Sequence, residues 1–211
     1  MTKKERFERF ISYFSVAMPE ADTELKYSNA FELLVAVMLS AQCTDKRVNM
    51  TTPTLFAAFP NAATMAQSTK EEMFAYIKSI SYPNSKAEHL VQMAKMLIEK
   101  HGGEVPNDFD SLVALPGVGR KTANVMLSVY FNQASMPVDT HVFRLSHRIG
   151  LVSKRCTTPL AVEKELVKNI PEELLSRAHH WLILHGRYVC KSANPQCKNC
   201  GLAEWCPSKK L

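Results

Sequence analysis

The chain has 211 residues, of which 46% are hydrophobic and 22% charged, and its formal net charge is +6. This composition excludes a disordered chain and is enough for one large or two small hydrophobic cores. The positive charge is weak evidence for a polyanionic partner. The N-terminus has no signal-peptide pattern, and the longest apolar run, residues 33–39, is too short to span a bilayer, which takes ~20 residues. We therefore expect a soluble cytoplasmic protein that does not bind a membrane.

Helical periodicity runs through nearly the whole chain, and no alternating strand of useful length interrupts it, so we expect an all-α fold. The first helix has its apolar residues on one face over residues 7–18 and stops before Pro19. Residues 31–40 are apolar almost all round, which predicts a buried central helix. Pro53 should kink or split the helix that follows Asp45.

Helix boundaries in the later part of the chain are marked by capping residues. Residues 68–71 read Ser-x-x-Glu, a capping-box pattern that predicts a helix start. Residues 84–100 are amphipathic, and the glycine pair at 102–103 predicts the stop. The Thr-Pro pair at 158–159 starts another helix with proline at its first position. Residues 171–188 form a further long helical segment.

Residues 115–123, Leu-Pro-Gly-Val-Gly-Arg-Lys-Thr-Ala, lie between two apolar helical patterns and predict a helix, a tight hairpin and a second helix. Gly117 can take a positive φ in the turn, and Gly119 lets a ligand approach the backbone closely. The N–H groups at the start of the second helix favour an anion such as a DNA phosphate. The alternative is a plain helix–turn–helix corner, which the glycines alone favour.

Lys121 points to chemistry at this hairpin. It lies in the first turn of the second helix, where the helix dipole disfavours a cation, and Arg120 adds repulsion. Both effects favour the neutral amine, which is the nucleophilic form and the one that makes Schiff bases. The alternative is an ordinary exposed lysine.

Asp139 lies in the segment 136–144, Met-Pro-Val-Asp-Thr-His-Val-Phe-Arg, just before a helical pattern. It can cap that helix, with Thr140 as a second candidate. A carboxylate at one helix start, near a lysine at another, can also relay the lysine proton or stabilise a carbocation. The two roles are compatible.

Four of the six cysteines gather near the C-terminus with the spacing C-x6-C-x2-C-x5-C: Cys190, Cys197, Cys200 and Cys206. Nothing in the sequence indicates secretion, so disulfides are the weaker interpretation. Zinc sites usually have two C-x2-C-like arms, and only one such arm is present here. The wide loops favour a [4Fe–4S] cluster modestly over zinc.

Together these segments resemble the endonuclease III family of the helix–hairpin–helix DNA glycosylase superfamily. The resemblance covers nearly the whole chain and is strongest at residues 115–123, 138–144 and 180–187 and in the cysteine spacing. Each segment alone is moderate evidence, but their joint occurrence in this order is highly specific.

The resemblance implies an all-α, two-lobed fold. One lobe would be a six-helix bundle over residues 23–133, with the helix–hairpin–helix at about 108–131. The other would join residues 1–22 to residues 134–211 and carry an iron–sulfur loop at 190–206. DNA would lie across the cleft between the lobes.

The resemblance also assigns residues to roles. Lys121 matches the family's nucleophile, Asp139 its essential carboxylate, and the four cysteines its [4Fe–4S] ligands. The implied DNA-binding residues are Gln42, which fills the gap left by the flipped nucleotide, and Tyr82, Gly117, Gly119, Arg120, Thr122, His141 and Lys191.

The implied enzyme is a monomeric DNA glycosylase and AP lyase, associated with the nucleoid through its DNA substrate. It would extrude an oxidised pyrimidine from duplex DNA and displace the base by attack of Lys121 on C1′. β-Elimination would then cut the strand on the 3′ side of the abasic site. Preformed abasic sites would also be substrates.

The chain departs from the family pattern at residues 81–83, Ser-Tyr-Pro, where relatives often have Gly-Leu-Tyr. This loop is the family's intercalating wedge, and we hypothesise that Tyr82 is the wedge residue, because an aromatic ring can stack on the orphaned base. Pro83 should restrict Tyr82 to an extended conformation. The loop after Cys190 is also less basic than in relatives, with only Lys191.

Three alternative functions fit the sequence less well. The related adenine-mismatch glycosylases carry a catalytic glutamate near position 36 and lack the lysine, whereas this chain has Ala36 and Lys121. A cluster-bearing electron carrier would need neither the hairpin nor Lys121. A DNA-binding structural protein with zinc would be distinguished by metal analysis. Most of the three histidines His179, His180 and His185 are expected to be packing or surface residues.

Overall fold

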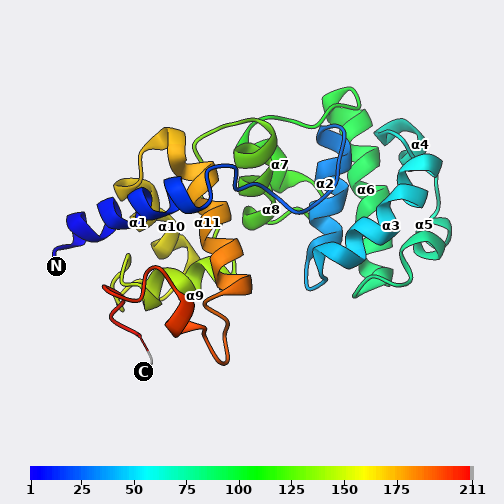
Figure 1. Cartoon of the computed structure of the whole chain (residues 1–211). Helices are drawn as coiled ribbons and strands as arrows, with labels where there is room; N and C mark the ends of the chain where they lie inside the picture. Colours follow the sequence, from blue (N-terminus) through cyan, green and yellow to red (C-terminus); the bar gives the residue numbers. More distant parts are fainter. Residues whose placement is uncertain (210–211) are drawn as a thin grey trace. The chain divides into compact units, whose positions relative to one another are not determined.

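A computed structural model describes residues 1–209 and confirms the expectation of an all-α fold: every regular element in this part of the chain is a helix (Figure 1). No helix of the described chain is both long and apolar enough to cross a membrane. The described residues form two compact units, one of residues 24–131 and one that joins residues 1–23 to 132–209.

The unit of residues 24–131 contains the hairpin. The resemblance implied a six-helix bundle in this region, and the described chain has seven α-helices and one π-helix there. The elements are α2 (Ala30–Ser40), α3 (Asp45–Ala58), α4 (Ala62–Ala66), α5 (Lys70–Ile77), α6 (Pro83–His101), α7 (Phe109–Ala114), α8 (Arg120–Val125) and the π-helix η1 (Met126–Tyr130).

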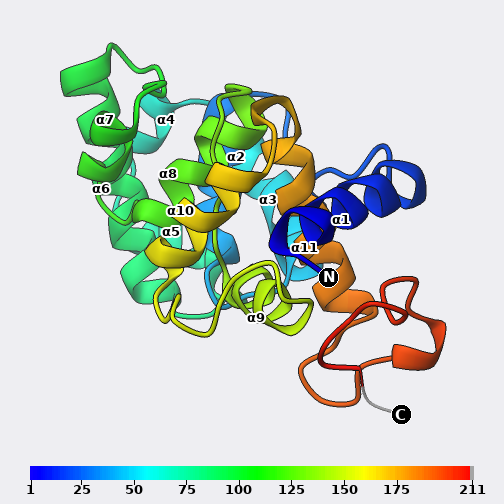
Figure 2. The same ribbon diagram turned by 90° about the vertical axis from the view of Figure 1, so that its left-hand side faces the viewer.

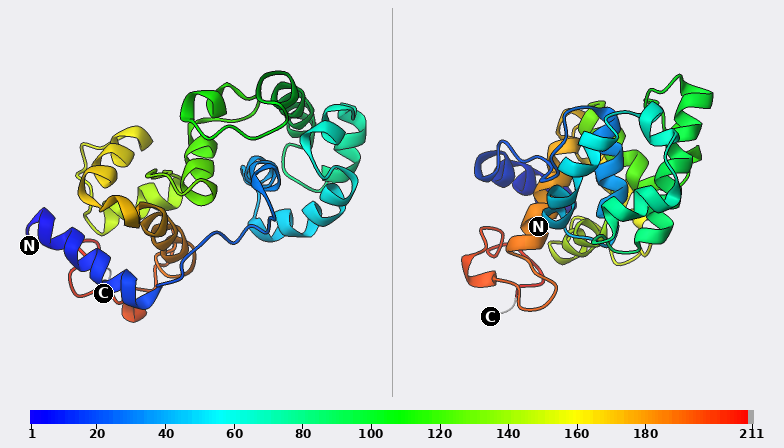
Figure 3. Two further views of the ribbon diagram at one scale, coloured as in Figure 1. Left: turned by 90° about the horizontal axis from the view of Figure 1, so that it is seen from above. Right: turned by 90° about the vertical axis from the view of Figure 1, so that its right-hand side faces the viewer.

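Helix α2 is the buried central helix that its sequence predicts. Asn29 begins it by accepting a hydrogen bond from the backbone N–H of Glu32 at 2.9 Å. Phe31 and all of residues 33–39 are buried. In the left view of Figure 3, which looks along this blue helix, other helices of its unit lie around it. Burial on every face explains why its sequence has no polar stripe.

Pro53 lies inside α3, which is not split there and continues to Ala58. Two other local expectations in this unit are wrong. The capping box before α5 is Thr69 with Glu72, one residue later than predicted from Ser68; both patterns have the required spacing, and the side-chain hydroxyl of Ser68 instead donates to the carbonyl of Met65 at 2.7 Å. Tyr82 is not extended.

Tyr82 has φ 55° and ψ 51°, the left-handed conformation, and is the residue that precedes α6. A following proline favours the extended region, so the left-handed angles of Tyr82 run against its local preference. The chain leaves the turn at Ile80 and must enter α6 at once, with Pro83 at its first position. This short connection between the turn and the helix explains the left-handed conformation of Tyr82.

The second unit contains α1 (Lys3–Ala17), α9 (Thr140–Arg148), α10 (Pro159–Asn169), α11 (Leu175–Tyr188) and the 3-10 helices η2 (Glu172–Leu174) and η3 (Cys197–Asn199). Its core joins the two ends of the sequence. Phe14 stacks on Trp181 with ring centroids 5.8 Å apart, and the Trp181 Nε1–H donates to the Met18 carbonyl at 2.7 Å. Helix α1 therefore packs on α11, and the cysteine loop follows the end of α11 (Figure 2).

Candidate functional site

The hairpin between α7 and α8 has the conformation that its glycines predict. Gly117 has φ +78°, and the Val118 N–H donates to the Leu115 carbonyl at 3.0 Å to close the turn. A Cβ on Gly117 would lie 2.8 Å from the Cβ of His89 and 2.9 Å from Cε of Met38. Gly117 is thus required for its backbone angle and for close packing.

Gly119 has a different function from Gly117. Its φ is −94°, an ordinary value, and a Cβ placed on it would meet no atom within 4 Å. It precedes α8 and supplies no side chain to cap the helix. The helix start is therefore open on the side where Gly119 is exposed, as the expected approach of a phosphate requires.

Lys121 lies in the first turn of α8 and is exposed to solvent. Its neighbour Arg120 places its guanidinium 4.8 Å from the ring centroid of Phe109 in α7, a cation–π contact across the hairpin. Thr122 is half-buried beside them. The structure therefore brings the predicted hairpin residues together at one exposed helix start.

Asp139 caps helix α9 in the other unit. Its Oδ1 accepts hydrogen bonds from the backbone N–H groups of His141 and Val142, both at 2.8 Å, and Oδ2 takes no part in this cap. The predicted capping role is confirmed. A carboxylate held in this way has a fixed orientation, which suits a charge-stabilising group.

His141 is half-buried against α11. A Cβ on Gly186 would lie 3.1 Å from the His141 Cβ, so any larger residue there would require His141 to shift. Arg144 donates from Nη2 to the carbonyls of Gly186 at 2.7 Å and Cys190 at 3.1 Å. The helix that Asp139 begins is thereby fixed to the chain that enters the cysteine loop.

Gln42 and Tyr82 are both exposed, and both have left-handed backbones, with φ 54° and 55°. Such angles are uncommon outside glycine and persist where the surrounding structure holds them. Gln42 follows the end of α2, and Tyr82 precedes α6. The structure presents both side chains to solvent, as the expected contacts with DNA require.

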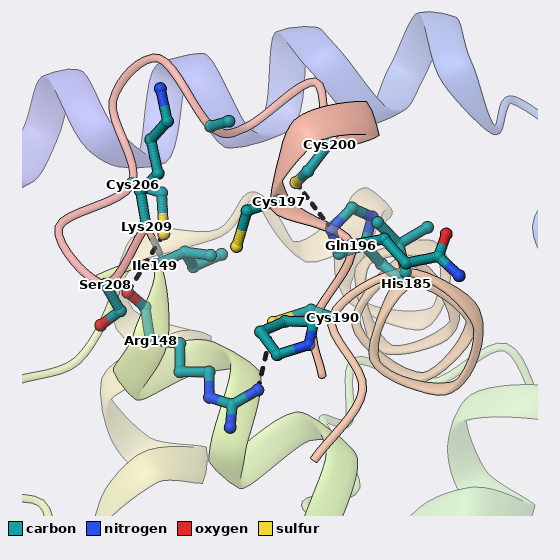
Figure 4. Close-up of a pocket in the computed structure, with 13 residues that line it drawn as sticks. Arg148, Ile149, His185, Cys190, Gln196, Cys197, Cys200, Cys206, Ser208 and Lys209 are labelled. Carbon is teal, nitrogen blue, oxygen red and sulfur yellow. Dashed lines mark hydrogen bonds between the residues drawn. The ribbon is translucent and has the colours of Figure 1, made fainter. Parts of the chain in front are cut away.

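The four C-terminal cysteines line one pocket with a cavity volume of about 130 Å³, and Figure 4 shows their side chains around it. Burial raises the pKa of the Cys200 and Cys206 thiols, and the neighbouring cysteines raise it further. Among the described residues, no three His, Cys, Asp or Glu side chains stand in a ready metal-binding arrangement. Lys191, after the first cysteine, is exposed.

Two residues that the sequence did not assign to this pocket lie in its wall. Arg148 donates from Nη1 to the Lys191 carbonyl at 2.6 Å and lies 3.6 Å from Cys190 Sγ. His185 has its Nε2 3.3 Å from Cys200 Sγ, and burial lowers its pKa to about 4. His185 was expected to be a packing or surface residue; it is buried, but it also contacts a cysteine. His185 and Cys200 are fifteen residues apart in the sequence, so the sequence alone did not indicate this contact.

Comparison with known proteins gives consistent matches to one family. Residues 35–172 match the family HhH-GPD, described as "HhH-GPD superfamily base excision DNA repair protein". The chain is 49% identical over 198 residues to Endonuclease III of Rickettsia felis, which covers 94% of this chain and 92% of the relative.

Two solved structures are also similar to this chain. One is a trapped endonuclease III–DNA covalent intermediate in its estranged-adenine complex, with a TM-score of 0.94 and 43% identity over 99% of this chain and 98% of the other. The second is a non-covalent endonuclease III–DNA complex, with a TM-score of 0.94 and 42% identity over 99% and 97%.

Proposed function

The chain belongs to the endonuclease III family of the HhH-GPD superfamily, and we propose that Lys121 and Asp139 carry out its chemistry on duplex DNA. It is a base excision DNA glycosylase with AP lyase activity. It acts on oxidised pyrimidines and on the abasic sites that their removal leaves. Because its substrate is duplex DNA, we place the enzyme in the cytoplasm, at the nucleoid.

Lys121 is the nucleophile. Its neutral amine attacks C1′ of the extruded nucleotide, the bond from C1′ to the base breaks, and the base leaves with the bonding electron pair and gains a proton. Opening of the sugar ring gives an iminium between Nζ and C1′. Loss of a proton from C2′ then breaks the bond from C3′ to oxygen, which cuts the strand on the 3′ side. The position of Lys121 in the first turn of α8, beside the open helix start at Gly119, supports this assignment.

Asp139 supplies the negative charge for base release. Its capping bonds fix Oδ1, so the carboxylate is held in place before substrate arrives. It stabilises the positive charge that develops on the sugar and accepts or relays the proton of the lysine.

The remaining predicted residues bind the DNA. Gly117, Gly119, Arg120 and Thr122 hold a phosphate at the hairpin; His141 and Lys191 contact the backbone from the other unit. Gln42 fills the gap left by the extruded nucleotide, and Tyr82 is the wedge. The open helix start at Gly119 and the exposure of Gln42 and Tyr82 support these contacts.

The four cysteines hold a [4Fe–4S] cluster. Their thiols converge on one pocket, and Arg148 and His185 present nitrogen atoms to two of the sulfurs, which suits thiolates bound to a cationic group. Burial raises the pKa of the Cys200 and Cys206 thiols, so their thiolates would be stable in this pocket only with a bound cation. When bound, the cluster supplies a rigid cross-link between four points of the loop.

Borohydride trapping tests the proposed chemistry. The protein is incubated with a labelled duplex that contains one abasic site, borohydride is added to reduce the Schiff base, and a denaturing gel separates the covalent complex. The wild-type chain should be trapped, whereas Lys121→Gln should give neither trapping nor strand cutting and should still bind the duplex. Undiminished trapping of Lys121→Gln would exclude this lysine as the nucleophile.

A further inference from the structure

Lys86 is a buried lysine at the start of α6, with only 9% of its surface exposed. An ammonium group is rarely buried unless partners replace its water. The neighbouring lysines of this region are different: Lys70 is in an exposed ion pair with Glu88, and Lys95 of α6 is exposed. The burial of Lys86 therefore requires a specific structural reason.

The partners of Lys86 are backbone carbonyls at the end of α2. Its Nζ donates to the carbonyl of Leu39 at 2.8 Å and to that of Ala41 at 2.6 Å. The last carbonyls of a helix lack partners within the helix and carry partial negative charge, so a cation is favourable there. Burial lowers the pKa of Lys86, and the nearby Cys43 opposes this effect.

These bonds connect the two segments whose side chains are proposed to enter the duplex. Gln42 comes directly after Ala41, and the Cys43 N–H donates to the Ser40 carbonyl at 3.0 Å to close the turn. On the other side, the backbone N–H of Lys86 donates to the Tyr82 carbonyl at 3.2 Å. Lys86 is therefore bonded through its main chain to one segment and through its side chain to the other.

Both segments contain a non-glycine residue in the left-handed conformation, Gln42 at φ 54° and Tyr82 at φ 55°. Such residues keep these angles only where surrounding bonds hold them. Two hydrogen bonds from a charged donor are strong enough to do so, and the bond to the Leu39 carbonyl is buried and thus shielded from water.

We propose that Lys86 is a positioning residue for base release, which holds the Gln42 and Tyr82 segments in one fixed arrangement so that both enter the duplex together. The inference rests on the proposed DNA contacts of Gln42 and Tyr82. Two groups that must act in one step act faster when they are already in place, because the ordering cost is removed before the DNA binds. Strand cutting at an abasic site that is already open depends on this arrangement much less.

The test compares Lys86→Met, which keeps the length and removes the charge and donors, with Lys95→Met, a matched change at an exposed site of the same helix. Single-turnover base release from a duplex with a paired oxidised pyrimidine should slow about tenfold in Lys86→Met, because the two segments are no longer ordered before the DNA binds. Strand cutting at a preformed abasic site should change less than about twofold. Lys95→Met should match the wild type in both reactions.

A double-mutant cycle separates positioning from general stability. In a chain that carries Gln42→Ala and Tyr82→Ala, Lys86→Met should cause no further slowing, because there are no side chains left to position. Equal slowing in both backgrounds would overturn the inference. Unchanged base release in Lys86→Met alone, with slow release in the Gln42→Ala/Tyr82→Ala chain, would also overturn it.

One further result would show that the proposed DNA contacts of Gln42 and Tyr82 are themselves wrong. If Gln42→Ala/Tyr82→Ala releases base as fast as the wild type, the proposed DNA contacts fail, and the inference fails with them. If Lys86→Met does not fold, as judged by circular dichroism, the same cycle is run with Lys86→Gln, which keeps a neutral donor. Amide hydrogen exchange at residues 41–44 should be faster in either variant. Exchange at the wild-type rate would contradict the proposal that Lys86 holds this segment in place.

Discussion

Asp139 and Val142 are joined by a hydrogen bond of 2.8 Å, in which the backbone N–H of Val142 donates to Oδ1 of Asp139. The same oxygen accepts from the N–H of His141, so one carboxylate oxygen caps α9. A residue proposed for base release is therefore also a structural element of its helix. This double use means that substitutions must be chosen to separate the two roles.

Asp139→Asn should separate them. Asparagine caps helices about as well as aspartate, so the melting temperature should stay close to that of the wild type. Base release should slow strongly, because the negative charge is lost. Asp139→Ala is the matched control: it should also lose about 1 kcal/mol of stability with the cap. If Asp139→Asn mainly lowers the melting temperature in thermal unfolding, the carboxylate is a cap and nothing more.

Cys197→Ser tests the proposed cluster. The purified wild-type protein should be yellow-brown and contain about four irons and four sulfides per chain. The serine variant should lose the colour and the iron, and proteolysis should cut within residues 190–206, because this segment has few buried apolar residues of its own. Cys156→Ser, outside the pocket, should keep the iron. One zinc per chain without sulfide would contradict the cluster.

Gly117→Ala and Gly119→Ala should fail in different ways. Alanine at 117 must adopt φ +78° with its Cβ against His89, which should cost about 1–3 kcal/mol in thermal unfolding. Alanine at 119 meets no protein atom, so the fold should be unchanged. Its methyl group should weaken binding to all duplexes alike, since the hairpin contacts phosphates and not bases. A loss confined to particular sequences in a binding titration would argue against the phosphate site.

Tyr82→Ala should slow base release from a paired lesion much more than strand cutting at a preformed abasic site. Only the first reaction includes unpairing and extrusion, and stacking of an aromatic ring on a base contributes about 1–3 kcal/mol. Tyr82 is 64% exposed, so its loss should leave the melting temperature almost unchanged. Equal effects on both reactions would place the wedge at another residue.

Lys191→Met should reduce the salt dependence of DNA binding. Each phosphate neutralised by the protein contributes about −0.9 to the slope of log K against log salt concentration. Loss of one phosphate contact should make the slope less steep by about that amount, with affinity reduced for every sequence. Lys95→Met is the matched control, and fluorescence anisotropy over a salt series measures both. An identical slope would show that Lys191 contacts no phosphate.

Much of the fold and part of the site follow from the sequence because their causes are local. The central helix α2, the left-handed Gly117 and the caps at Asp139 and Thr158 depend on residues within a few positions of each other. Short-range hydrogen bonds and steric limits of this kind can be predicted from the sequence, because the residues that cause them are close together in it. The errors are also local: two capping patterns overlap at Ser68 and Thr69, and sequence could not choose between them.

What only the tertiary structure decided involves residues that are far apart in the chain. Lys86 reaches the carbonyls of Leu39 and Ala41, and His185 reaches Cys200, because packing of helices brings them together. Side-chain bonds to a distant backbone leave no periodic signal, since any residue offers a carbonyl. The sequence by itself determined which residues carry the proposed chemistry, and the packed helices determined which residues hold them in place, because burial and long-range hydrogen bonds exist only once the chain is folded.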